Sequence, residues 1–242
     1  MNKPILGIIG GVGPLATAYF MEAIIKKTPA ATDQDNIPMI VFNDPQIPDR
    51  TAYILDHSRP DPQPEMRKVA RWLEDAGADY LAIACNTAHY FYDAISDAVD
   101  VPVLNIMEET AKHIALDVGR GGRVGLMATD GTVQSGVFQG YLAERGLVGV
   151  VPRAQTQRRI MSLIYDGVKA NAPYDPGELC AIAEELRQEG CDAVVVGCTE
   201  LSVIYQDLAE RPTWLYDSLD VLAQRCVDLY LWARERGGDI GM

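Results

Sequence analysis

Two cysteines stand at the ends of similar apolar runs. The segment LAIACNTAHY (81–90) leads into Cys85, and the segment VVVGCTELSV (194–203) leads into Cys198. A cysteine at the carboxyl end of a strand and beside a helix N-terminus lies where a thiolate is stabilised. We therefore predict that the pKa of both thiols is well below the free value of about 8.5, and that both can carry protons in a reaction.

Small polar side chains follow each cysteine. Asn86 and Thr87 come directly after the first cysteine, and Thr199 follows the second. Such groups often cap helix N-termini, and they can also hold a carboxylate and fix the plane of a small substrate between two sulfurs. Because the two roles can coexist, both stay open for these three residues.

The other cysteines and the histidines indicate neither disulfides nor a metal. The five cysteines are odd in number and form no C-x-x-C pair. We expect Cys180, Cys191 and Cys226 to fill the core. Only His89 lies near a cysteine, and no second ligand pair follows it. We expect His89 to pack or cap near the site, since the paired cysteines already supply the proton carriers.

Composition excludes several classes of partner. The chain has 242 residues, 48% of them hydrophobic and 23% charged, as in ordinary globular proteins. A formal net charge of −13 repels nucleic acids and anionic membranes, although a small anion could bind in a locally positive pocket. The N-terminal apolar run is too short for a secretory signal, and no window approaches 18 apolar residues. We expect a cytoplasmic protein.

Strand and helix patterns alternate along the chain, and the second half repeats the first. Strand patterns stand at 5–9, 37–44, 78–85, 101–106, 121–128, 191–199 and 211–217. In the first half, 76 residues separate the end of the first strand, at Ile9, from the strand end at Cys85. In the second half, 70 residues separate the corresponding positions, Ala128 and Cys198. The repeat predicts an α/β fold of two similar doubly wound domains related by a pseudo-two-fold axis.

The repeat also predicts where the cysteines meet. We assign 1–106 and 211–242 to the first domain and 107–210 to the second. In open parallel sheets, ligands bind outside the carboxyl ends of the strands. A pseudo-symmetric pair of sheets therefore places Cys85 and Cys198 across one interdomain cleft, which would be the active site.

The glycine-rich turn GIIGGVGP (7–14) follows a strand and precedes a helix, as in nicotinamide enzymes. Its spacing is not G-x-G-x-x-G, however, and Pro14 stands where the helix starts. A turn that lets a small anionic ligand approach backbone amides fits these glycines better.

Two cations stand near unusual segments. Arg50 lies in the proline-rich stretch 45–65, where we expect a long loop with little regular structure, and such loops are usually functional. Lys169 lies in IYDGVKAN (164–171). A lone cation in an acidic protein is more often a solvated surface charge.

Taken with these residues, the chain resembles the aspartate/glutamate racemase superfamily, and within it the cofactor-independent aspartate racemases. The matching segments span nearly the whole chain: GIIGGVGPLAT, FNDPQIPDRTAYIL, CNTAH, EETAK, GLMATDGT, IYDGVKA and GCTEL. Glutamate racemases typically carry an acidic-serine turn near the N-terminus and a histidine after the second Cys-Thr. Here Gly10, Gly11 and Glu200 stand instead, which favours the aspartate branch.

The resemblance implies a homodimeric enzyme without pyridoxal phosphate or another cofactor. It implies that Cys85 and Cys198 exchange protons with opposite faces of one Cα atom, in complementary protonation states. The substrate would be a small acidic amino acid, namely aspartate, with glutamate as a further candidate. The residues expected to bind the substrate are Gly11, Arg50, Asn86, Thr87, Ala88, Thr132, Lys169 and Thr199.

Other functions stay open at this point. The wider superfamily includes hydantoin racemases, decarboxylases and maleate isomerases, so a cysteine pair alone does not fix the substrate. An amino-acid-binding or redox-sensing protein would need only one cleft and one reactive thiol.

Overall fold

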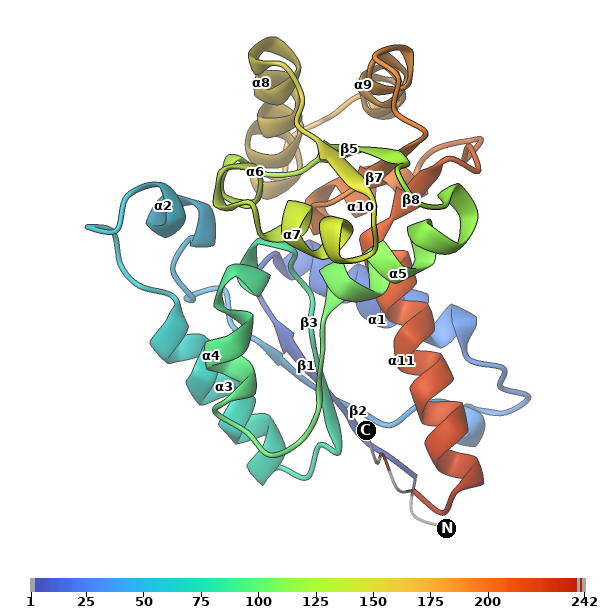
Figure 1. The fold of residues 1–242 in the computed structure, drawn as a ribbon. Coiled ribbons are helices and arrows are strands. Elements are labelled where there is room, and N and C mark those ends of the chain that lie inside the picture. The colour runs from blue at the N-terminus through green and yellow to red at the C-terminus, as the bar shows by residue number, and fades with distance from the viewer. Residues whose placement is uncertain (1–2, 239, 241–242) are drawn as a thin grey trace.

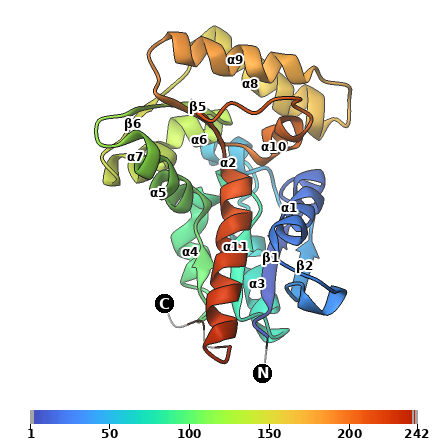
Figure 2. The same ribbon diagram turned by 90° about the vertical axis from the view of Figure 1, so that its right-hand side faces the viewer.

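Two parallel sheets form the framework of the molecule, with helices packed around each (Figures 1 and 2). The computed structural model describes residues 3–238 and 240. Sheet A consists, in the order β2-β1-β3-β4, of β1 (Leu6–Gly10), β2 (Met39–Asn43), β3 (Tyr80–Ile83) and β4 (Val103–Leu104). Sheet B consists, in the order β6-β5-β7-β8, of β5 (Arg123–Met127), β6 (Val148–Val150), β7 (Ala193–Val196) and β8 (Leu215–Asp217). Both sheets have the same strand order and only parallel pairs, which confirms the predicted fold class.

The inner strands of each sheet are short apolar runs that are buried on both faces. Every residue of β1, β3 and β7 is buried. Parallel strands covered by helices on both faces contain apolar residues in succession rather than in alternation. The register pairs Ile9 with Ile83 in sheet A and Met127 with Val196 in sheet B, so the inner strands of each sheet end side by side.

Helices connect the strands of each sheet. Those up to β5 are α1 (Pro14–Lys27), η1 (Asp33–Asp35), α2 (Arg50–Leu55), α3 (Gln63–Asp75), η2 (Thr87–Phe91), α4 (Tyr92–Ser96) and α5 (Ile106–Val118). Those after it are α6 (Asp130–Ser135), α7 (Val137–Glu144), α8 (Ala154–Ser162), the π-helix η3 (Leu163–Lys169), α9 (Pro176–Gln188), α10 (Thr199–Gln206) and α11 (Ser218–Glu235). None of the helices within residues 3–238 and 240 has the length and apolar character needed to span a bilayer.

The last helix after each sheet packs against the other half. Helix α5 follows β4 of sheet A but packs on α7, and α11 follows β8 of sheet B but packs on α1. The two helices also contact each other, and Figure 2 shows α11 descending from sheet B along sheet A. One continuous apolar cluster consequently contains Tyr80 of sheet A, Leu126 of sheet B and Tyr230 of α11.

The packing of α5 and α11 against the opposite halves can be compared with the predicted domain boundaries. Helix α11 lies beside sheet A, as the assignment of 211–242 to the first domain requires. Strand β8 falls within the same assigned stretch but pairs with β7 in sheet B. The boundaries as a whole stay a prediction, with β8 running in the second sheet.

Three local expectations are corrected by side-chain caps. The stretch 45–65 contains the short helix α2 within an otherwise irregular segment, because the Asp49 carboxylate accepts a hydrogen bond from the Ala52 amide (2.8 Å) and starts this helix. The strand expected at 101–106 ends at Leu104, since Asn105 caps α5. The strand expected at 121–128 ends at Met127, since Thr129 caps α6.

Gly11 is the position where the turn after β1 tolerates no side chain. Its φ is +80°, and a Cβ atom there would lie 2.2 Å from the Asp44 carbonyl carbon. Gly136 has a similar φ of +71°, but nothing lies within 4 Å of a Cβ atom built there.

Gly11→Ala should therefore destabilise the fold much more than Gly136→Ala. Both variants carry the strain of a left-handed residue, about 1 kcal/mol, and only Gly11→Ala adds a backbone clash, for a total of roughly 3 kcal/mol or more. Urea unfolding of the two variants measures the difference. Equal losses of unfolding free energy would contradict the close approach to Asp44.

Candidate active site

The two cysteines lie at facing strand ends. Cys85 comes two residues after β3, and Cys198 is the N-cap residue of α10, which follows β7. The Thr199 hydroxyl donates to the Ala84 carbonyl oxygen (3.3 Å) and so joins the start of α10 to the end of β3. Both cysteine side chains are buried, and Cys85 lies close enough to Cys198 to contribute to the raised pKa of the Cys198 thiol. The structure therefore brings the predicted pair together.

Two cavities lie at this junction. An outer one of about 530 Å³ is lined in part by Gly11, Pro45 and Val168. An inner one of about 10 Å³ is lined by residues that include Cys85 and Thr87. Four residues line both cavities: Asp49, Arg50, Lys169 and Glu200. The inner cavity has room for about one water molecule, so the conformation is closed around the cysteine.

Arg50 is a buried cation of the site. Its side chain is 7% exposed, and Nη1 donates to the carbonyl oxygens of Ile47 (3.2 Å) and Pro48 (3.0 Å). Burial alone would lower the pKa of Arg50, but the charges of Cys85, Asp49 and Glu200 outweigh it and raise that pKa. Arg50 and Cys85 line the same inner cavity. Among the described residues Nε has no hydrogen-bond partner, so the guanidinium keeps a donor for a ligand.

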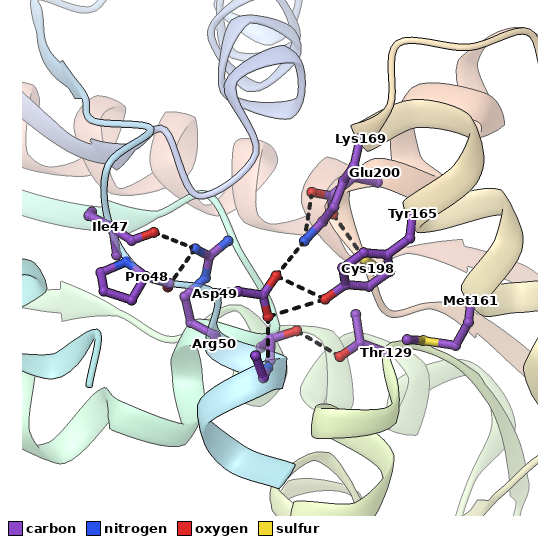
Figure 3. A network of polar contacts seen from close by, with 12 residues as sticks. Ile47, Pro48, Asp49, Arg50, Thr129, Met161, Tyr165, Lys169, Cys198 and Glu200 are labelled. Carbon is purple, nitrogen blue, oxygen red and sulfur yellow. Dashed lines mark hydrogen bonds and ion pairs between the residues drawn. The ribbon is translucent and has the colours of Figure 1, made fainter. Parts of the chain in front are cut away.

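Lys169 is the second cation, at the end of the π-helix η3. Its Nζ lies 3.5 Å from Asp49 Oδ2 and 3.9 Å from Glu200 Oε1, and 4.3 Å from the centre of the Tyr165 ring (Figure 3). Burial would lower the pKa of Lys169, but Glu200, Tyr165 and Asp49 together raise it. Lys169 therefore stays charged, and neither cation of the site is a solvated surface charge.

Asp49 and Tyr165 were missed by the sequence analysis. The Tyr165 hydroxyl donates to Asp49 Oδ2 (3.0 Å) and lies 3.3 Å from Oδ1, so the loop before α2 is bonded to η3 (Figure 3). The Asp49 side chain is 37% exposed, and Lys169 is the largest influence that lowers its pKa against burial. Both residues lie in segments quoted for the resemblance, yet neither pattern indicates that they would meet.

Cys198 has a carboxylate partner. Its Sγ atom donates to Glu200 Oε2 (3.0 Å), and both side chains are 3% exposed. Burial and the Glu200 carboxylate raise the pKa of the Cys198 thiol well above its ordinary value, while Lys169 opposes them. The expectation of a lowered pKa is therefore wrong for Cys198, because burial and Glu200 outweigh the helix N-terminus. For Cys85 the expectation stays a prediction.

The predicted hydroxyl and amide groups join the two halves rather than standing free. The Thr87 hydroxyl lies 2.9 Å from that of Thr129, and the Thr132 hydroxyl donates to Thr87 (3.1 Å). Asn86 donates from Nδ2 to Ser218 Oγ (2.9 Å), and its Oδ1 has no hydrogen-bond partner in the described part of the chain. Some predicted binding residues are buried but line neither of the two cavities: Asn86, Ala88, Thr132 and Thr199.

His89 fixes the main chain at Cys85. The Ile106 amide donates to Nε2 (3.1 Å), so the proton lies on Nδ1, which donates to the Cys85 carbonyl oxygen (2.8 Å). Burial lowers the pKa of His89 to about 4, against smaller opposing effects of backbone hydrogen bonds. His89 also joins no metal site, since residues 3–238 and 240 contain no suitable group of three or more His, Cys, Asp or Glu.

Comparison with known proteins shows the family of the chain. The sequence profile described as Asp/Glu/hydantoin racemase matches residues 9–226. The chain belongs to the Asp/Glu/hydantoin racemase family. The broad specificity amino-acid racemase RacX of Bacillus subtilis is 30% identical over 93% of this chain and 98% of its own length. A glutamate racemase of Desulforudis audaxviator is 29% identical over 87% of this chain and 72% of its own.

A solved structure extends the likeness to the fold. The aspartate racemase of Picrophilus torridus is 29% identical, with a TM-score of 0.76 over 93% of this chain and 94% of its own. The prediction of an isomerase, an amino-acid racemase of the Asp/Glu racemase family, is thus confirmed. The relatives differ in the substrates that their names give, so family membership alone does not choose between aspartate and glutamate.

The buried imidazole of His89 should make stability depend on pH. Because the pKa of His89 is lower in the folded chain than the unfolded value of about 6.5, the unfolded chain binds the proton more readily between pH 6.5 and about 4. Its contribution is thus fully present above about pH 6.5 and is lost as the pH falls towards 4, on the order of 3 kcal/mol in all.

The measurement compares urea unfolding of the wild type and His89→Gln from pH 7 to pH 4. The wild type should lose unfolding free energy more steeply than the variant, and nitrogen NMR should show a neutral imidazole protonated on Nδ1 at pH 7. Parallel pH profiles, or an imidazolium at pH 6, would contradict the assignment.

Proposed function

We propose that this chain interconverts L- and D-aspartate by proton transfer at Cα between two cysteines. The observation that carries the proposal is that Arg50 and Lys169 line the same small cavity as Cys85. In a chain of net charge −13, two largely buried cations beside a reactive thiol suit a substrate with two carboxylates. The likeness to the Picrophilus torridus aspartate racemase supports the same substrate.

The proton transfer would use both thiols in opposite roles. One cysteine, as thiolate, removes the α-proton, and the other, as thiol, delivers its own proton to the opposite face of Cα. The enzyme thus ends each turnover with the same number of protons, exchanged between Cys85 and Cys198. Arg50 and the backbone amides at the start of α10 would stabilise the negative charge that develops on the substrate.

Substrate entry must open the closed conformation. The inner cavity of about 10 Å³ cannot hold an amino acid. Asp49 already presents a carboxylate to Lys169 at 3.5 Å. A substrate carboxylate that replaced Asp49 at Lys169 would keep the cation paired while the site opened, so Asp49 acts as a stand-in for the substrate in the empty enzyme.

Each alternative function predicts a different result with aspartate. Glutamate is the second candidate substrate, because glutamate racemases are among the relatives. A hydantoin racemase or a maleate isomerase would leave aspartate unchanged, and a binding protein would bind it without exchanging its α-proton. The homodimer and the cytoplasmic location expected from the resemblance and the composition are part of the same proposal.

Cys85→Ala and Cys198→Ala should each abolish racemisation. Each variant lacks one of the two proton carriers, so neither can complete the transfer across Cα. Chiral chromatography of L-aspartate incubated with pure protein measures the rate. In deuterated water the wild type should place deuterium at Cα of the product.

Cys180→Ala is the matched control for these variants. Cys180 lies within α9 rather than at a strand end and is partly exposed, so its loss should leave the rate unchanged. Full turnover by either active-site variant would overturn the two-base scheme.

Arg50→Leu and Lys169→Leu should each lower kcat/KM for aspartate about 30-fold or more. Losing one charged hydrogen bond to a buried carboxylate costs about 2 to 5 kcal/mol of transition-state binding. Lys68→Leu is the control, since the Lys68 side chain is 76% exposed and pairs with Glu65 on the surface of α3. Alanine should be a poor substrate of the wild type. Near wild-type kcat/KM in both active-site variants would return the choice of substrate to the wider family.

A further inference from the structure

With an ionised Glu200, the contact between Cys198 and Glu200 requires a proton on the sulfur. An ionised carboxylate accepts hydrogen bonds but donates none, so Cys198 must carry its proton to bond Glu200 Oε2 at 3.0 Å. A thiolate at Cys198 would face the carboxylate instead, in a place where little water screens the repulsion, since both side chains are 3% exposed.

Glu200 is held in this place by its surroundings. Its Oε1 atom forms an ion pair with Lys169 Nζ at 3.9 Å. A Cβ atom at Gly13 would come within 2.8 Å of the same oxygen, so the carboxylate packs against the glycine turn that begins α1. Oε1 therefore lies between Lys169 and the glycine turn, while Oε2 faces Cys198.

The charged groups around the two thiols are different. Cys198 faces Glu200 of α10, Lys169 of η3 and Cys85 at the end of β3. Of these, only Lys169 favours a thiolate, and burial and Glu200 outweigh it, which raises the pKa of Cys198. Cys85, by contrast, lines the inner cavity together with the buried Arg50, a cation whose charge favours a thiolate.

We propose that Glu200 is a positioning residue that keeps Cys198 as the thiol of the resting enzyme, so that Cys85, beside Arg50, is the thiolate. The proposal rests on the two-cysteine reaction given above and assigns its starting state. Cys85 removes the first proton and forms an S–H bond, and Cys198 gives its proton to the other face of Cα. The enzyme then holds a thiolate next to Glu200. To restore the resting form, Cys85 must release its proton to solvent and Cys198 must take one up.

Alkylation of Cys198 tests the role of Glu200 without using any substrate. Cys85→Ser removes the competing thiol, and iodoacetamide is added at a series of pH values with and without Glu200→Gln. Mass spectrometry follows Cys198 and, in the same digest, Cys180 as an internal control on α9. Glutamine keeps the size of the side chain but removes its charge. The pH midpoint for Cys198 should therefore fall by about one unit or more, about tenfold in rate at a fixed pH, while that for Cys180 stays.

Two further measurements complete the test. Glu200→Asp, which retains the charge, should keep the high midpoint, and it replaces the glutamine variant if that variant does not fold. In the wild type at neutral pH, Cys85 should be alkylated before Cys198. Three results would each overturn the proposal. The first is an unchanged Cys198 midpoint in Glu200→Gln, and the second is a midpoint in Glu200→Asp that falls as far as in a folded Glu200→Gln. The third is faster alkylation of Cys198 than of Cys85 in the wild type.

Failure of the enzyme function gives a different pattern. A wild type that does not racemise aspartate, combined with a lowered Cys198 midpoint in Glu200→Gln, contradicts the proposed reaction but supports the role of Glu200 in setting the thiol. A wild type that racemises aspartate, combined with an unshifted Cys198 midpoint in Glu200→Gln, supports the proposed reaction but contradicts the role of Glu200.

Discussion

The site depends on one constraint: the carboxyl ends of β3 and β7 must face each other. Neither sheet contains both thiols, so any chemistry that uses the two requires the halves to hold a fixed distance. The structure meets this requirement with buried hydrogen bonds across the junction: Thr199 donates to the carbonyl oxygen of Ala84, and Thr87 bonds to Thr129. Polar groups buried in this way must find partners, and the partner of each lies in the other half. The hydroxyls that could cap helices therefore also fix the alignment of the two sheets.

Burying charge near the junction imposes a second constraint. Arg50, Lys169, Asp49 and Glu200 converge on one small cavity, and each would be costly to bury alone. The closed conformation pairs Lys169 with both carboxylates and places Arg50 beside Cys85. Because removal of one member would leave its partner uncompensated, the cations must exchange one anion for another when a ligand binds. A ligand that carries its own carboxylates satisfies this exchange better than a neutral one.

Periodicity and strand-end position were enough to predict the parallel sheets and the cysteine pair, because these depend on local pattern and on a repeat. The contacts within the site were not predictable in the same way. Asp49 starts a helix inside a proline-rich stretch and meets Tyr165 more than a hundred residues later. Glu200 was visible beside Cys198, but a separation of two residues does not reveal that its carboxylate turns back onto the sulfur in a buried place. The sign of the Cys198 pKa shift depends on that contact and on burial, and the sequence pattern contains neither.

The two sides of the junction differ in what holds them. On the side of α5 and α11, one apolar cluster runs through residues of both sheets, and separating it would expose large side chains such as Tyr80 and Tyr230. Around the cavity, the halves also meet through the hydrogen bond between Tyr165 and the partly exposed Asp49. Water or a polar ligand can replace such polar contacts at little cost, whereas nothing in solution replaces the buried apolar surface. Opening should therefore begin at the Asp49–Tyr165 bond and turn about α5 and α11, which admits a ligand to Cys85 while the sheets stay joined.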